Sequence, residues 1–449
     1  MRKKALYFFI VFAVIIVVLY LWRYKQSQVF ENRVPANATK VVNVNLRQIE
    51  NHLLFDFLAN PITYLKPRKR KDSLKKPRVS LNNGVSIPRN ILFYSNSNKL
   101  KDNWFSSVIG ITDLEKLSRF LVKEKFVKHT ENKIIFYTKA NIVLAIKDEQ
   151  LILGLKSDKK ATIFPLLISL FDIKDYLRED DTILKPLINS ESDISFSLGD
   201  DWLEADFNKG FFELQGALDS DLFVTNVNQT PNENGIVSLS GKINRHNSTF
   251  KQFLADKKEK FNEITHLSLD SIIDKWNGKL NMNIASIEQK TDTIVSYEYD
   301  DDFNKVEIKS TQKKKIPTLS LILGQEKSSS LSDYFYSKNA IQIIENDTVF
   351  TAIPIYKFLA ADVEENFELY ITEKKKQSAS MVTTSKLNFY FNAEKYMENP
   401  LDIPLNKDQK KLLKLVKTTK LDWTENNEFS LKINLKNTNR NFLGKLIKQ

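Results

Sequence analysis

Two stretches far apart in the chain share one pattern, "VIGITDLEKLSRF" at 108–120 and "ILGQEKSSSLSDY" at 322–334. They align without a gap, so that Gly110 falls on Gly324 and Phe120 on Tyr334. Each begins with apolar residues typical of a strand and continues into apolar residues at helical spacing. A strand followed by a helix, met twice, predicts that the chain contains two related folding units.

The first of these stretches also predicts where its helix begins. Thr112 and Glu115 have the spacing of a capping box, in which two side chains satisfy free backbone N–H groups of the first turn. Leu114, Leu117 and Leu121 then recur at the spacing of one helical face. We therefore expect an amphipathic helix that is capped by Thr112 and packs this face on a core.

Four further pairs of segments occur in the same order along the chain. They are 42–53 with 267–280, 136–151 with 335–350, 194–198 with 387–391, and 237–254 with 429–446. A single short pair of this kind arises by chance, whereas five pairs in one order favour an internal duplication. We expect the first unit to occupy 34–260 and the second 261–449.

Strand patterns outnumber helical patterns in both predicted units. The segments at 136–151 and 335–350 read as β-hairpins with polar turns near Asp148 and Asp347. The sequence therefore predicts an α+β fold, in which antiparallel strands and hairpins carry amphipathic helices on one face. Two such units side by side would leave a cleft between them.

The N-terminal segment predicts a transmembrane signal anchor at 5–22. These 18 residues are apolar or aromatic, carry no charge, and would form a helix about 27 Å long. A cleaved signal peptide is the alternative. Basic residues on both sides favour a short cytoplasmic N-terminus at 1–4, a linker at 23–33 and a periplasmic main body at the bacterial inner membrane.

The positive charge of the chain is concentrated in two places. Residues 1–25 contain five basic residues and no acid, and 66–78 contains eight basic residues and one acid, Asp72. These two stretches account for the whole formal net charge of +12. The eight basic residues of the second stretch, here called the basic run, are Lys66, Arg68, Lys69, Arg70, Lys71, Lys75, Lys76 and Arg78.

The basic run is the predicted contact site. A concentrated positive loop fits anionic lipid headgroups or an acidic partner protein, and a solvated loop without a partner is the third possibility. Nucleic acid is disfavoured, because the predicted orientation places the loop outside the cytoplasm and only Tyr64 is near enough to stack on bases.

The sequence offers no constellation of catalytic or metal-binding residues. The chain has no Cys, and its four His residues lack metal-ligand spacing. Neither a nucleophile elbow nor a glycine-rich phosphate loop occurs. We therefore predict no catalytic site, no cofactor and no metal.

Two segments resemble uncharacterised bacterial membrane-anchored envelope proteins of the domain-of-unknown-function type. They are "VPANATKVVNVNLRQI" at 34–49, where Pro35, Ala38, Val42, Val44 and Leu46 carry the likeness, and "ANIVLAIKDEQLILGL" at 140–155. The resemblance implies an envelope location and a duplicated α+β ectodomain, and it brings no activity or site residues with it.

These observations lead to three functional expectations. The first is a non-enzymatic, single-pass envelope protein whose duplicated ectodomain binds a partner protein or the membrane surface. The second is a ligand-binding or chaperone-like module that holds an apolar lipid or peptide in the cleft between the units. The third is an enzyme of unrecognised type.

Overall fold

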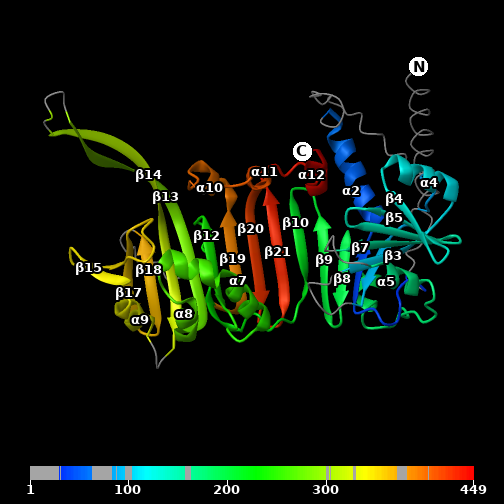
Figure 1. Cartoon of the computed structure of the whole chain (residues 1–449), viewed down its shortest axis with the longest axis horizontal. Helices are drawn as coiled ribbons and strands as arrows, with labels where there is room; N and C mark the ends of the chain where they lie inside the picture. The colour runs from blue at the N-terminus through cyan, green and yellow to red at the C-terminus, as the bar shows by residue number, and fades with distance from the viewer. Residues whose placement is uncertain are drawn as a thin grey trace, which may run out of the picture. The chain divides into compact units, whose positions relative to one another are not determined.

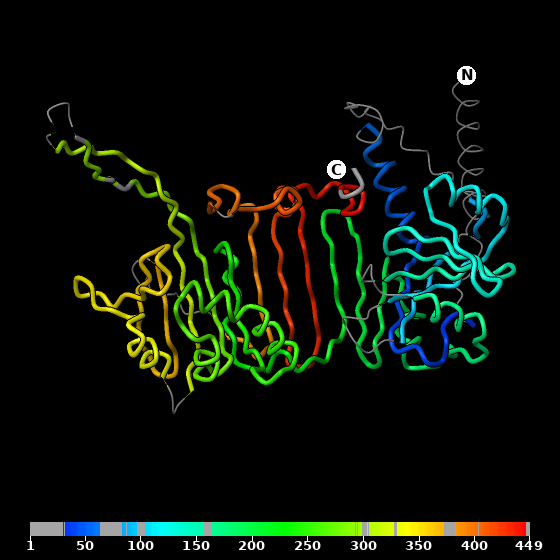
Figure 2. Tube along the Cα trace, viewed as in Figure 1, coloured from blue at the N-terminus to red at the C-terminus, as the bar shows by residue number. Residues whose placement is uncertain are grey.

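The computed structural model describes residues 30, 32–62, 83–86, 88–96, 104–156, 163–299, 303, 305–326, 330–371, 382–402 and 404–448. The chain divides into two compact units, 1–209 with 443–449 and 210–442. Figures 1 and 2 show that antiparallel strands dominate both units.

The first unit contains a nine-stranded antiparallel sheet. Along this sheet the order is β9-β8-β1-β2-β3-β7-β6-β5-β4. Its strands are β1 (Lys40–Val44), β2 (Ile91–Ser95), β3 (Trp104–Gly110), β4 (Val127–Glu131), β5 (Ile134–Lys139), β6 (Ile142–Lys147), β7 (Gln150–Lys156), β8 (Ile194–Leu198) and β9 (Asp201–Phe207). Its helices are α2 (Leu46–Ala59), α4 (Leu114–Lys123), α5 (Phe164–Leu170) and α6 (Lys185–Ile188).

Helices cover both faces of the meander β4–β7. On one face Leu117 and Leu121 of α4 pack with a buried cluster that includes Tyr137 of β5. On the other face Leu167 of α5 packs with a cluster that includes Phe136. Because neighbouring residues of a strand point to opposite faces, this double cover explains why β6 is a nearly continuous apolar run.

The second unit contains an eleven-membered antiparallel strand order, β10-β21-β20-β19-β12-β13-β14-β18-β17-β16-β15. The short β11 (Asn226–Gln229) pairs with the first residues of β19, beside β12. The other strands are β10 (Phe211–Ala217), β12 (Val237–Lys242), β13 (Trp276–Tyr299), β14 (Lys305–Gln325), β15 (Ile341–Ile344), β16 (Asp347–Phe350), β17 (Phe358–Val363), β18 (Asn366–Ile371), β19 (Val382–Asn392), β20 (Val416–Thr424) and β21 (Glu428–Leu435).

Three helices of the second unit, α7 (Ser248–Thr265), α8 (Leu269–Lys275) and α9 (Leu331–Ser337), pack on one apolar cluster. Its buried members include Trp276, Phe335 and Phe367. In β18 only alternate residues are fully buried, as expected for a strand with one covered face. The remaining helices of this unit are α10 (Ala393–Glu398) and α11 (Lys407–Leu415), whereas α12 (Phe442–Lys448) lies, apart from its first residue, in the C-terminal segment of the first unit.

The two strand orders have nine positions in common. If both sets are read in chain order, each strand of the first unit has an equivalent in the second. The equivalents of β1, β2, β3, β4–β7, β8 and β9 are β12, β13, β14, β15–β18, β19 and β20. The register agrees as well, because Gly110 lies opposite Gln150 and Gly324 lies opposite Asn366. The second set of strands begins at Val237, so it starts earlier in the chain than residue 261.

The predicted fold class, an N-terminal transmembrane helix followed by two α+β units with helices on one face, is wrong. The described chain is dominated by antiparallel sheet, and the first unit carries helices on both faces of its meander. Among the described residues no helix has the length and apolar character needed to cross a bilayer. The predicted span 5–22 lies outside those residues, and the structure gives no support to a single-pass anchor.

Candidate functional site

The predicted contact site, the basic run, lies outside the described residues. This holds for all eight of its members, Lys66, Arg68, Lys69, Arg70, Lys71, Lys75, Lys76 and Arg78. The nearest described element before it in the chain is α2, which is followed by Asn60, Pro61 and Ile62.

The beginning of α2 is fixed by its cap and by its backbone contacts. The Asn45 side chain accepts a hydrogen bond from the backbone N–H of Gln48 at 3.2 Å, which satisfies one free donor of the first turn. The Asn45 backbone N–H donates to the carbonyl oxygen of Asp193, at the start of β8. These contacts hold the N-terminal half of α2 beside the strands of its unit.

The C-terminal half of α2 carries an exposed apolar stripe. Leu54, Phe55, Leu58 and Ile62 are 42%, 66%, 61% and 72% exposed. Residues four apart lie on one side of a helix, so Leu54 and Leu58 follow one line and Phe55 lies beside it, whereas Ile62 lies after the end of α2 at Ala59. Asp56, by contrast, is only 6% exposed. This part of the helix turns its apolar side outward, the reverse of an ordinary surface helix.

His52, one turn before the stripe, joins α2 to a buried carboxylate. Its Nδ1 lies 3.1 Å from Oδ2 of Asp193, whose side chain is fully buried. The hydrogen bond to Asp193 raises the pKa of His52, with a smaller contribution from the charge of Asp206, while burial of the ring opposes the rise. The imidazolium form is thus favoured, and it ties α2 to the strands beneath.

Asp193 belongs to a wider polar network. Its Oδ2 also accepts from the backbone N–H of Phe207 at 2.7 Å, and its own N–H donates to Oδ1 of Asp206. The Ser192 hydroxyl donates to Oδ2 of Asp206. Oδ1 of Asp193 is buried without a hydrogen-bond partner among the described residues. A buried, unpaired carboxylate oxygen is unfavourable, so a positive charge on His52 stabilises this carboxylate.

A cavity of about 300 Å³ lies within the second unit. Lys420 occupies it between two acids, 3.1 Å from Glu233 and 3.8 Å from Asp422. The hydrogen bond to Glu233 is the main cause that raises the pKa of Lys420, and burial raises the pKa of Asp422. Hydroxyl and amide side chains form most of the remaining lining, so the cavity does not suit an apolar ligand.

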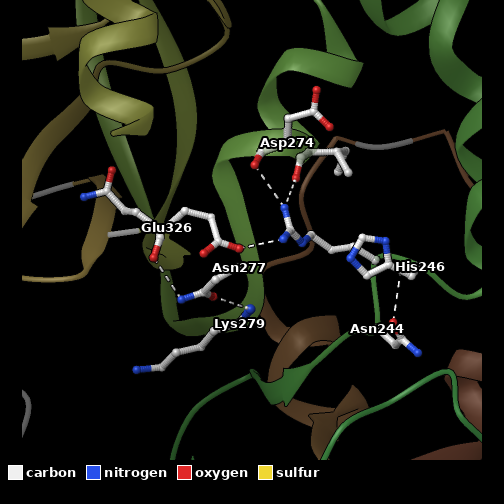
Figure 3. Close-up of polar contacts among 9 residues, drawn as sticks. Asn244, His246, Asp274, Asn277, Lys279 and Glu326 are labelled. Atoms are coloured by element: carbon white, nitrogen blue, oxygen red, sulfur yellow. Dashed lines mark hydrogen bonds and ion pairs between the residues drawn. The ribbon is translucent and has the colours of Figure 1, made fainter. Parts of the chain in front are cut away.

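A second polar cluster in this unit is structural (Figure 3). The Arg245 guanidinium donates to the carbonyl oxygens of Ile273 and Asp274 and to the Glu326 carboxylate at 2.5 Å. It thereby joins the turn after β12 to the end of α8 and the residue after β14. Its donors are engaged by fixed protein acceptors, so the cluster serves to hold three segments together.

The described residues contain no group of His, Asp or Glu side chains arranged to hold a metal ion. His129, His246 and His266 each lie in a different part of the fold from His52, in β4, in the turn before α7 and at the end of α7. Sequence reasoning missed that His52 faces a buried acid. Asp193 is 141 residues away in the chain, and only the sheet brings the two together.

Comparison with known proteins adds little to this geometry. No family model matches the chain, and no curated protein matches it either. Among solved structures, crystal form IV of TP0453 covers 41% of this chain and 80% of its own at 11% identity and a TM-score of 0.25. Crystal form I of TP0453 covers 76% of this chain and 93% of its own at 8% identity and a TM-score of 0.23. Similarity at this level carries no argument about fold or function.

Proposed function

We propose that the chain binds the surface of an anionic lipid bilayer through the apolar stripe of α2 and the basic run that follows it. The observation that supports this function is the exposure of Leu54, Phe55 and Leu58 of α2 and of Ile62, three residues after its end. In the sequence the first residue of the basic run, Lys66, follows Ile62 by four positions.

Each part supplies a different component of the binding free energy. Burial of apolar side chains in the acyl boundary is favourable by roughly 25 cal/mol per Å² of apolar surface. Each Lys or Arg near an anionic surface contributes about 1 kcal/mol, and the basic run carries eight with one acid. An apolar helical side beside concentrated basic charge is the pattern of a helix that lies in the membrane interface.

The position of α2 within the first unit agrees with this function. Its N-terminal half is held by Asn45 and His52, whereas the C-terminal half carries the exposed stripe. Figure 1 shows the C-terminal end of α2 beyond the ends of β8 and β9. A bilayer can therefore approach this end of the helix without meeting the neighbouring strands.

The test compares variants of the chain that starts at Ser27, which lacks the N-terminal apolar segment. The double variant Phe55→Ser/Leu58→Ser is mixed with vesicles of phosphatidylglycerol or phosphatidylcholine, and co-sedimentation is measured. We expect binding of the parent chain to the anionic vesicles only, and a loss of at least about ten-fold in the variant, because both stripe side chains no longer leave water. Replacement of all eight basic-run residues by Gln should abolish the preference for anionic lipid.

Phe253→Ser/Ile264→Ser provides the matched control. Phe253 and Ile264 of α7 are 56% and 59% exposed, so the control removes similar exposed apolar groups from a helix that no basic run follows. We expect this variant to bind as the parent does. Equal binding by all variants, or an equal loss in the control, would exclude the α2 stripe as the lipid contact.

A further inference from the structure

The hairpin of β13 and β14 continues well past the sheet that contains it. These strands have 24 and 21 residues, but β12 pairs with β13 only over Lys279–Ile284 and β18 pairs with β14 only over Leu319–Gly324. Beyond these segments the two strands pair only with each other in the described part of the chain. We call residues 288–299 and 305–316 the β-arm, which Figure 1 shows clear of the other strands of its unit.

The β-arm is exposed over most of its described length, except near its base, where Lys315 contacts Pro400 and Asp402. Every residue of β14 from 305 to 314 is exposed. A two-stranded hairpin is at best marginally stable in water, and unpaired strand edges are templates for a further strand. A ribbon of this length therefore gains stability when another strand pairs with it.

One face of the β-arm combines lysines with apolar side chains. Alternate residues share a face, which places Lys305, Lys309 and Lys313 together, opposite β13 residues that include Val295 and Tyr297. The Lys305 ammonium lies 4.0 Å from the centre of the Tyr297 ring. Glu307, on the same face, forms an ion pair with Lys309 at 3.1 Å, so the face keeps a surplus of positive charge.

The sequence between the two strands of the hairpin is acidic, which bears on the class of partner that the lysines can attract. The sequence that joins the two strands contains three consecutive acids, "DDD" at 300–302. In the sequence these three negative charges stand three to five positions before Lys305, so they weaken attraction to an extended anionic surface such as a bilayer or a nucleic acid. A single extended polypeptide can contact the face that carries Lys305, Lys309 and Lys313 alone.

We infer that the β-arm binds an extended acidic polypeptide, which adds as a strand to the edge of β14 that, before Leu319, pairs with no other described strand. Main-chain hydrogen bonds supply affinity, as in other strand additions, and side chains at every second position supply specificity. Acidic residues at alternate positions of the partner would lie across from Lys305, Lys309 and Lys313. This interaction is independent of lipid binding by α2.

The test uses the full-length chain and a fluorescent eight-residue peptide of alternating Val and Glu. Fluorescence anisotropy should show saturable binding that weakens with salt, and no binding of the corresponding Val-Lys peptide. The variant Lys305→Glu/Lys309→Glu/Lys313→Glu should weaken binding at least about ten-fold, because attraction becomes repulsion. The control Lys251→Glu/Lys257→Glu/Lys260→Glu, which changes exposed lysines of α7 by the same charge, should bind as the parent does.

Hydrogen exchange distinguishes strand addition from simple charge attraction. Addition of the peptide should slow exchange of backbone amides within 305–314, whose outward N–H groups would become donors to the new strand. Absence of peptide binding, an equal loss in the α7 control, or binding without slower exchange in this segment would each overturn the inference. Circular dichroism of each variant checks that it remains folded.

Discussion

At the scale of single residues, polar groups determine where the elements of the first unit are held. His52 reaches a fully buried carboxylate, Asp193, which also accepts a backbone N–H group. Asp113 rather than Thr112 caps α4, since its side chain accepts from the N–H of Lys116 at 2.9 Å. The sequence predicted this helix and its buried Leu117 and Leu121 correctly, but placed the cap one residue early and buried Leu114, which is 40% exposed.

The His52–Asp193 pair predicts a pH-dependent stability. The pKa of His52 is raised in the folded state, so its contribution is fully present below the pKa of an unfolded histidine and is lost as pH rises through the folded-state pKa. Urea unfolding of the parent and of His52→Gln should therefore differ most at about pH 5 and least at about pH 9. A difference that stays constant across this range would show that the imidazolium contributes nothing.

Gly84 predicts a second residue-scale effect. Its φ is +82°, and a Cβ there would lie 2.1 Å from the carbonyl oxygen of Asp113, at the cap of α4. Gly84→Ala should therefore lower the free energy of unfolding by clearly more than about 1 kcal/mol. Gly199→Ala is the matched control, because its φ is also positive, at +60°, but nothing lies within 4 Å. Equal losses of stability in the two variants would contradict the steric explanation.

At the scale of elements, burial on one face or on two decides what a strand looks like in the sequence. The hairpin predicted at 136–151 with a turn near Asp148 is confirmed as β6 and β7, and Asp148 lies in the turn between them with φ +53°. The hairpin predicted near Asp347 is also present, as β15 and β16, but it is not the equivalent of the first, because the segment at 335–350 begins on α9 with Phe335. The equivalent of β6–β7 is β17–β18, whose turn residue Glu364 also has φ +53°. Because β6 is buried on both faces, its sequence does not alternate between apolar and polar residues. The equivalence of the two hairpins was therefore not visible in the sequence.

The same difference predicts unequal local stability of two long hairpins. β6 and β7 are covered on both faces, whereas the β-arm is exposed on both. Amides of β6 should exchange with solvent only through large-scale opening, and those of 305–314 through local opening at far higher rates. Hydrogen exchange of the isolated chain, followed by mass spectrometry, measures both segments in one experiment. Similar rates would mean that the β-arm is already covered.

At the scale of the whole molecule, the sequence indicated that an order of strands is repeated, but it did not indicate which strands are neighbours in the sheet. The pairs 108–120 with 322–334 and 194–198 with 387–391 fall on equivalent strands. The pair 42–53 with 267–280 does not, because the first is β1 and α2 and the second is α8 running into β13. Local apolar spacing reports a strand or a helix, whereas sheet neighbours depend on contacts distant in the chain.

The functional features were the least predictable part. The basic run stood out from composition alone, but the apolar stripe of α2 has the spacing of a core-facing helix, and only the fold shows that it points outward. The length of the β-arm was hidden in the same way, because nothing in its sequence marks where β12 and β18 stop pairing with it.

The two-sided cover of the first unit's meander has a consequence for mutational tolerance. A polar replacement at any position from Val143 to Ile146 would enter one packed layer or the other. In β18 such a replacement at Tyr370 would reach the less buried side, where Glu368 already lies. A saturation mutagenesis scan should accordingly find that consecutive positions of β6 reject polar residues. In β18 only alternate positions should reject them.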